Sequence, residues 1–223
     1  MNRLIFVALS FLLLQHSVTQ GGKDDGGVKV DKEKRTVTID AKIAPRKLPQ
    51  YKEIYPLEVI ACWPDPKGKK AHETIVTIDA LPSKVHKGLV ELGLKPGAPV
   101  MGGDKEEPQG PDVNVYLDIP QSDGEMKRVS IDKTMVAVGT GKPFPKTVKW
   151  RFTGSVMSKP DPNKAELAYG ADLTGTLIAI FPVTNQTVLQ TSLSMQYEKY
   201  MKLETKGLPK EGTPVKLVIE APK

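Results

Sequence analysis

Regular alternation of apolar and polar side chains along much of the chain predicts β-strands. In residues 35–43 every second side chain from Val37 onward is apolar, which is the period of a strand with one solvated face. Residues 28–31 have strand character and are separated from this segment only by a charged turn at residues 32–34. We therefore expect these two strands to pair as an antiparallel hairpin.

The same signal recurs further along the chain. An alternation in residues 113–119 is followed by a turn at residues 120–124 and by another strand at residues 127–131, which predicts a second hairpin. Residues 185–201 fit both a strand and a helix, and the pattern does not choose between them. Other strand candidates, separated by connectors rich in proline and glycine, are residues 147–153, 175–181 and 215–220.

One segment, residues 83–93, has the pattern of an α-helix. Its apolar residues recur at positions i, i+4 and i+7 from Val85, Ser83 is a suitable N-cap, and Gly93 can end the helix. With one short helix among many strands, we expect a β-rich fold of the α+β class with mostly antiparallel strands. A mature chain of about 200 residues fits a single domain, here residues 28–223.

Residues 1–20 have the pattern of a secretory signal peptide. Arg3 supplies a positive charge, and residues 4–14 form an apolar run that is short for a membrane span. We expect an exported protein, located in the periplasm, in the cell envelope or outside the cell, with a flexible leader at residues 21–27. An uncleaved signal anchor is the alternative, and it is the one attachment to a membrane that the sequence predicts, because no later segment is comparably apolar.

Composition narrows the classes of function. A single cysteine cannot form an internal disulfide, and no Cys-x-x-Cys pair is present to hold an iron–sulfur cluster. The formal net charge is +6, but nearly all basic residues are lysines, whereas nucleic-acid recognition favours arginine interleaved with aromatic residues. We therefore expect neither an iron–sulfur cluster nor a nucleic-acid partner.

The residues best suited to chemistry gather in one short window between Cys62 and His86. The window contains the only cysteine and every histidine outside the predicted signal peptide. Residues 57–63 and 72–78 are apolar strand candidates, and the loop between them favours a wide hairpin that brings Cys62 and His72 to the same end. The first turn of the predicted helix would then place His86 nearby.

Three interpretations of this window stay open. In the first, Cys62 is a thiolate nucleophile, His72 or His86 is its base, and Glu73 or Asp79 orients the imidazole. In the second, Cys62, His72 and His86 bind a divalent metal, zinc or copper. In the third, Cys62 is a buried core thiol, and the protein is a structural component of the envelope without an active site. Whether the protein is an enzyme is left undecided.

Further candidate ligand-binding residues lie in two turns. Lys70 belongs to a lysine cluster around Gly68, which suits either an anion-binding loop or a solvated turn. Tyr169 and Asp172 lie in the segment AYGADLTG, where the aspartate can contact a ligand or accept hydrogen bonds from backbone N–H groups. With His86, these three residues form the candidate ligand-binding set.

Four separate blocks of the chain form a distinctive series, namely PLEVIACWPDPKGKKAHETIV, ALPSKVHKGLVELGLKPGAPV, WRFTGS and YGADLTGTLIAIF. In their order and spacing they resemble the YdjY-like family of exported bacterial proteins, whose activity is not established. The closing GLPKEGTPVKLVIE is similar to the C-terminus of planctomycete-type members. Cysteine-rich cluster-binding segments, which some relatives carry, have no counterpart in this chain.

The resemblance implies a shared site at Cys62, His72, Glu73 and His86 without naming its chemistry. The leading hypothesis is therefore an exported protein with a ligand- or metal-binding pocket around these four residues. An enzyme that uses Cys62 as its nucleophile and a structural protein without a site are the alternatives.

Overall fold

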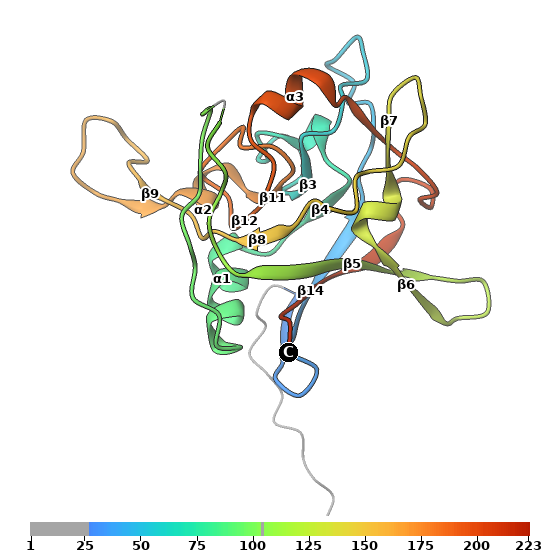
Figure 1. Cartoon of the computed structure of the whole chain (residues 1–223), viewed down its shortest axis with the longest axis horizontal. Coiled ribbons are helices and arrows are strands. Elements are labelled where there is room, and N and C mark those ends of the chain that lie inside the picture. Colours follow the sequence, from blue (N-terminus) through green and yellow to red (C-terminus); the bar gives the residue numbers. More distant parts are fainter. Residues whose placement is uncertain (1–26, 104) are drawn as a thin grey trace, which may run out of the picture.

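The strands form one large sheet that closes on itself (Figure 1). The computed structural model describes residues 27–103 and 105–223, so the predicted signal peptide and nearly all of the predicted leader lie outside it. In spatial order the strands are β1 (Val28–Asp31), β2 (Thr36–Ile43), β14 (Pro214–Glu220), β5 (Asp112–Pro120), β8 (Trp150–Phe152), β12 (Leu189–Thr191), β11 (Thr176–Ala179), β3 (Val59–Cys62) and β4 (Val76–Ile78). Because β4 also pairs with β2, the strands from β2 round to β4 make a closed ring.

Smaller elements surround this ring. The strand β6 (Met126–Ser130) extends β5 as an outer hairpin. Two small sheets pair β9 (Met157–Ser158) with β10 (Ala168–Tyr169) and β7 (Met135–Ala137) with β13 (Leu203–Thr205). The helices are α1 (Pro82–Glu91), α2 (Gly170–Thr174) and α3 (Gln196–Tyr200), with 3₁₀ turns η1 (Ala71–Glu73) and η2 (Ile131–Thr134). Within the described ranges, every helix is too short or too polar to cross a lipid bilayer.

The alternating strands place their apolar side chains inside the ring. In β2, Val37 and Ile39 are fully buried, whereas Lys42 is exposed on the outer face. The buried side chains of β5 and β14 alternate in the same way and join one apolar core with those of β2. Burial of this apolar surface is the main force that stabilises the ring. The predicted β-rich fold of mostly antiparallel strands is confirmed, since among the described strands only β3–β4 and β11–β12 pair in parallel.

Both hairpins predicted from the sequence are confirmed. Strands β1 and β2 pair antiparallel across the charged turn, and β5 pairs antiparallel with β6. The three further strand candidates correspond to β8, β11 and β14, although β8 is shorter than its predicted range. The ambiguous segment, residues 185–201, contains both kinds of structure, with β12 followed by α3.

The hairpin predicted between residues 57–63 and 72–78 is wrong, because β3 and β4 run parallel. The connection between them returns along β3, and the backbone N–H of Glu58 donates to the carbonyl oxygen of Glu73 at 3.1 Å. Strand β4 therefore begins at the same end of the sheet as β3. As a result His72 lies in η1, beside the start of β3, and is not in a strand that ends next to Cys62.

Helix α1 packs against β1 and β2. A side chain at Gly88 would meet Val30 at 3.0 Å and Val37 at 3.2 Å, so glycine allows the close approach of the helix to β1 and β2. The predicted end is confirmed, since Gly93 follows the helix with a φ of +87°, a conformation that favours glycine. The predicted cap is wrong, because α1 begins at Pro82 and the residue at the N-cap position is Leu81, not Ser83.

Candidate functional site

Cys62 is a buried core residue at the end of β3, with an exposed fraction of 0%. It belongs to a small apolar cluster with Leu48, Val59, Ala71 and Ala179. The Sγ atom donates a hydrogen bond to the carbonyl oxygen of Trp63 at 3.2 Å. Burial raises the pKa of the Cys62 thiol to about 12, so the thiol stays protonated near neutral pH. This environment is that of a core thiol.

His72 is the middle residue of η1, and its imidazole packs against two aromatic rings. Its imidazole stacks on Tyr51, with ring centroids 4.4 Å apart, and meets Tyr55 edge-on at 5.2 Å. The Nε2 atom lies 3.4 Å from Oε1 of Glu73. Burial lowers the pKa of His72, and the positive charge of Lys70 lowers it further. The imidazole is therefore neutral at neutral pH and is held in place by its neighbours.

Glu73 and Lys70 belong to a half-buried ionic network beside His72. The Nζ atom of Lys70 donates a hydrogen bond to Oε2 of Glu73 at 2.8 Å and also forms a salt bridge with Glu58. Burial raises the pKa of the Glu58 carboxyl. Burial opposes the charged form of Lys70, but hydrogen bonds to the two carboxylates outweigh it and raise the pKa of the lysine. The charge of Lys70 is thus shared by two carboxylates of the protein itself.

His86 is the fifth residue of α1 and pairs with Tyr169. Its Nδ1 atom is 2.7 Å from the tyrosine hydroxyl. The imidazole also packs edge-on against Phe152 and Tyr169, at centroid distances of 5.0 Å and 5.3 Å. Burial lowers the pKa of His86 and raises the pKa of Tyr169, so both side chains are neutral at neutral pH.

Asp172 caps α1 from the neighbouring helix α2. Its Oδ1 atom accepts a hydrogen bond from the backbone N–H of Ser83 at 2.8 Å, which satisfies one of the free N–H groups in the first turn. Three of the four predicted ligand-binding residues, His86, Tyr169 and Asp172, therefore gather at the start of α1. The fourth, Lys70, lies in the separate network with Glu58.

The predicted metal ligands do not come together. In residues 27–103 and 105–223, no group of three or more histidine, cysteine, aspartate or glutamate side chains is placed to hold a metal ion. Within the same ranges, no hydrogen bond, ion pair or ring contact joins any two of Cys62, His72 and His86. The side chains as placed do not provide the compact donor set that zinc or copper requires.

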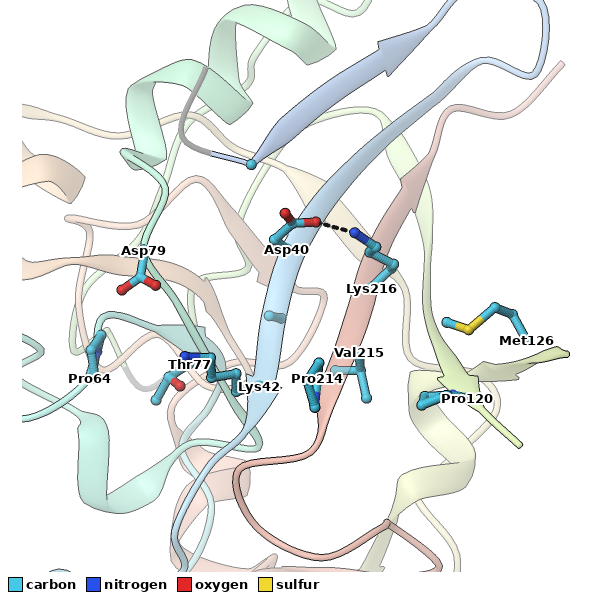
Figure 2. A pocket seen from close by; sticks show the side chains of 12 residues that line it. Asp40, Lys42, Pro64, Thr77, Asp79, Pro120, Met126, Pro214, Val215 and Lys216 are labelled. Atoms are coloured by element: carbon cyan, nitrogen blue, oxygen red, sulfur yellow. Dashed lines mark hydrogen bonds and ion pairs between the residues drawn. The ribbon is translucent and has the colours of Figure 1, made fainter. Parts of the chain in front are cut away.

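A broad groove crosses the outer face of the ring (Figure 2). It has a volume of 790 Å³ and passes over β4, β2, β14 and the end of β5. The walls carry the charged side chains of Asp40, Lys42, Asp79 and Lys216 and the apolar side chains of Pro64, Pro120, Met126, Pro214 and Val215. Asp40 and Lys216 form an ion pair across β2 and β14. Pockets that bind small ligands have volumes in this range, from about 300 to 1,000 Å³.

Comparison with protein-family models matches residues 28–220 to the YdjY domain. The chain belongs to the YdjY family. This match confirms the resemblance of the four sequence blocks. No curated protein and no solved structure matches the chain significantly.

The YdjY domain contains both the window from Cys62 to His86 and almost the whole groove. The window contributes Pro64, Thr77 and Asp79 to the groove, and of these only Asp79 was considered from the sequence, as a group that could orient an imidazole. The sequence does not predict the groove residues, because the strands were recognised by their inward-facing apolar residues and the outward-facing positions follow no such pattern. Their one sequence signal is that proline repeatedly occupies strand ends.

Proposed function

We propose that this YdjY domain is an exported binding protein that holds a small ligand in the outer groove and does not use Cys62 as a nucleophile. The signal pattern of residues 1–20 supports export. The groove itself supports binding, and it is the observation that carries the proposal.

The groove combines the two features of a small-ligand site. Pro64, Pro120 and Met126 give it apolar walls, while Lys42 brings a charged group into its middle and Asp79 brings another to the end beside Pro64 (Figure 2). Ligand sites pair a mostly apolar lining with a few polar groups that fix orientation. The outward face of a sheet is usually polar where water covers it, so an apolar stretch across this face favours a bound molecule as its cover.

Thiol catalysis has less support from the contacts around Cys62. A cysteine nucleophile needs a thiolate and a nearby base, and the pKa of the Cys62 thiol is raised by burial to about 12. The nearest candidate base in the sequence, His72, is in contact with Tyr51 and Glu73 instead. A non-covalent binding role requires neither a thiolate nor a base.

Methionine methyl NMR tests this proposal directly. Met126 lines the groove, whereas Met157 is comparably exposed, at 55%, and lies outside it. Titration with a set of small amphipathic fragments should shift the Met126 methyl signal and leave the Met157 signal unchanged.

A variant that fills the groove supplies the control. Thr77→Trp places a large side chain in the groove and should abolish the shift of Met126, whereas Lys149→Trp changes an exposed residue elsewhere and should preserve it. If no fragment moves the Met126 signal, or if the shift survives in Thr77→Trp, the groove is not a ligand site.

A further inference from the structure

The groove continues beyond its first hollow. A second hollow of 520 Å³ shares Pro64 and Asp79 with it and is further lined by Trp63, by the charged residues Asp65 and Lys67, and by Leu81, which is 42% exposed. Together the two hollows form one trough with an exposed apolar side chain toward each end. One end carries Met126 and the other carries Leu81.

Two charges of opposite sign lie between these apolar ends. Lys42 and Asp79 both line the groove, and neither side chain has a hydrogen-bond or ion-pair partner among the described residues. By contrast, Asp40 and Lys216 neutralise each other. Within the first hollow, Lys42 and Asp79 are therefore the charged groups that are free to contact a ligand.

The register of the sheet sets the approximate spacing of these two charges. Lys42 of β2 is the direct partner of Thr77 of β4, and Asp79 directly follows the end of β4 at Ile78, two residues beyond Thr77. Diagonal neighbours of this kind on adjacent strands are about 7–8 Å apart. In an extended dipeptide the terminal ammonium and carboxylate are separated by two residues, which corresponds to about 7 Å.

We infer that the trough binds a short peptide with free termini and apolar side chains, an inference that rests on the proposed function of the groove. The peptide ammonium lies against Asp79 and its carboxylate against Lys42. The N-terminal side chain extends toward Leu81, and the C-terminal side chain toward Met126. An uncharged ligand would remove water from Lys42 and Asp79 without giving them a hydrogen-bond or ion-pair partner. Loss of hydration without such a partner costs free energy and would weaken binding.

Blocked and free dipeptides test the ligand class. The dipeptide Leu-Leu should shift the Met126 methyl signal and bind measurably in calorimetry. The same dipeptide with an acetylated N-terminus and an amidated C-terminus keeps the apolar side chains but loses both charges, and it should bind roughly tenfold more weakly. Equal affinity for the free and the blocked dipeptide would overturn the inference.

Charge variants test the assigned residues. Lys42→Glu and Asp79→Lys should each weaken binding of Leu-Leu roughly fivefold, because each reverses an attraction at the rim. Lys149→Glu makes the same change of charge outside the groove and should leave the affinity unchanged. All three positions are exposed, so folding of the variants is expected and is checked by their thermal unfolding.

The outcomes separate this inference from the proposed function. If other fragments shift Met126 while Leu-Leu does not, the ligand class is wrong and the groove is still a binding site. If neither fragments nor dipeptides shift the Met126 methyl signal, both the peptide inference and the proposed binding function of the groove are wrong. If Leu-Leu binds but Lys42→Glu and Asp79→Lys keep full affinity, the peptide termini do not contact these residues and the inference is overturned.

Discussion

The hydroxyl of Tyr169 lies 2.7 Å from Nδ1 of His86 and so links two residues that are 83 positions apart in the chain. The contact joins the second turn of α1 to the end of β10. Since both side chains are half-buried, water cannot fully replace either partner when the other is removed. We therefore treat the pair as a structural link between distant segments of the YdjY domain.

Removal of this hydroxyl should destabilise the fold. Tyr169→Phe should lower the free energy of unfolding in urea by about 1 kcal/mol, the usual contribution of a neutral hydrogen bond. Tyr116→Phe is the matched control, because Tyr116 is also half-buried but its hydroxyl has no hydrogen-bond partner among the described residues. Equal effects of the two substitutions would show that the contact with His86 contributes nothing.

The capping bond between Asp172 and Ser83 can be tested by two alanine substitutions. Asp172→Ala should lower the free energy of unfolding by about 1 kcal/mol, because it removes the acceptor for the Ser83 N–H. Ser83→Ala keeps that N–H and should change stability by less than about 0.5 kcal/mol. The opposite ranking would restore the sequence-based prediction that the Ser83 side chain caps α1.

Lys70 should be the most important member of the ionic network. Lys70→Met leaves the half-buried carboxylates of Glu58 and Glu73 without their shared counterion and should lower the free energy of unfolding by about 2 kcal/mol. The control is Lys34→Met, because the Lys34 side chain is 80% exposed in its salt bridge with Asp31 and should contribute less than about 0.5 kcal/mol. A loss in Lys70→Met no larger than that of the control would mean that the carboxylates need no counterion.

The Cys62 thiol should be unreactive in the native protein. Its exposed fraction is 0% and its pKa is raised by burial to about 12, so the thiol should resist an aromatic disulfide reagent at pH 8. In urea the same thiol should react at a rate typical of a cysteine with its ordinary pKa of about 8.5. Rapid reaction of the native protein at pH 8 would contradict burial and would revive the nucleophile interpretation.

Acidification should weaken the fold through its histidines. Burial lowers the pKa values of His72 and His86 from 6.5, so the unfolded chain binds protons at these groups before the folded chain does. Stability contributed by the neutral imidazoles is therefore present above pH 6.5 and is lost as the pH falls from there toward the lowered folded-state values.

The variant His86→Gln isolates this effect. Glu58, whose pKa burial raises, contributes with the opposite sign, but it is present in both proteins and its effect cancels in the comparison. Between pH 7.5 and 5.5 the wild-type protein should lose more free energy of unfolding than His86→Gln, by no more than about 1.4 kcal/mol per pH unit, which is the limit for one group. Parallel losses in the two proteins would contradict a lowered pKa at His86.

Local patterns explain which parts of the fold the sequence predicts. The hairpins β1–β2 and β5–β6 follow from alternation and a nearby turn, both of which are visible within a few residues. The parallel pairing of β3 and β4 depends instead on the path of the connection, which the backbone bond between Glu58 and Glu73 holds along β3. That bond involves no side chain and therefore leaves no pattern in the sequence.

In the candidate site, too, the sequence predicts local features but not the contacts between distant segments. Cysteine and histidine are rare in this chain, which directs attention to Cys62, His72 and His86. Their rarity does not reveal that Cys62 is a core thiol. Nor does it reveal that His72 stacks on Tyr51 and that His86 pairs with Tyr169. The groove was missed because its residues come from five strands, β2, β4, β5, β6 and β14, and from the loops beside them, and only the folded sheet brings them side by side.

The position of β14 has a consequence for biosynthesis. This last strand in sequence lies between β2 and β5 and pairs with both, so the ring cannot close until residues 214–220 have been made. While translation proceeds, β2 and β5 present unpaired edges that favour contact with other chains. For the exported protein that we propose, this delay keeps the ring open until residues 214–220 have been made, and passage through a membrane can precede the closure of the ring.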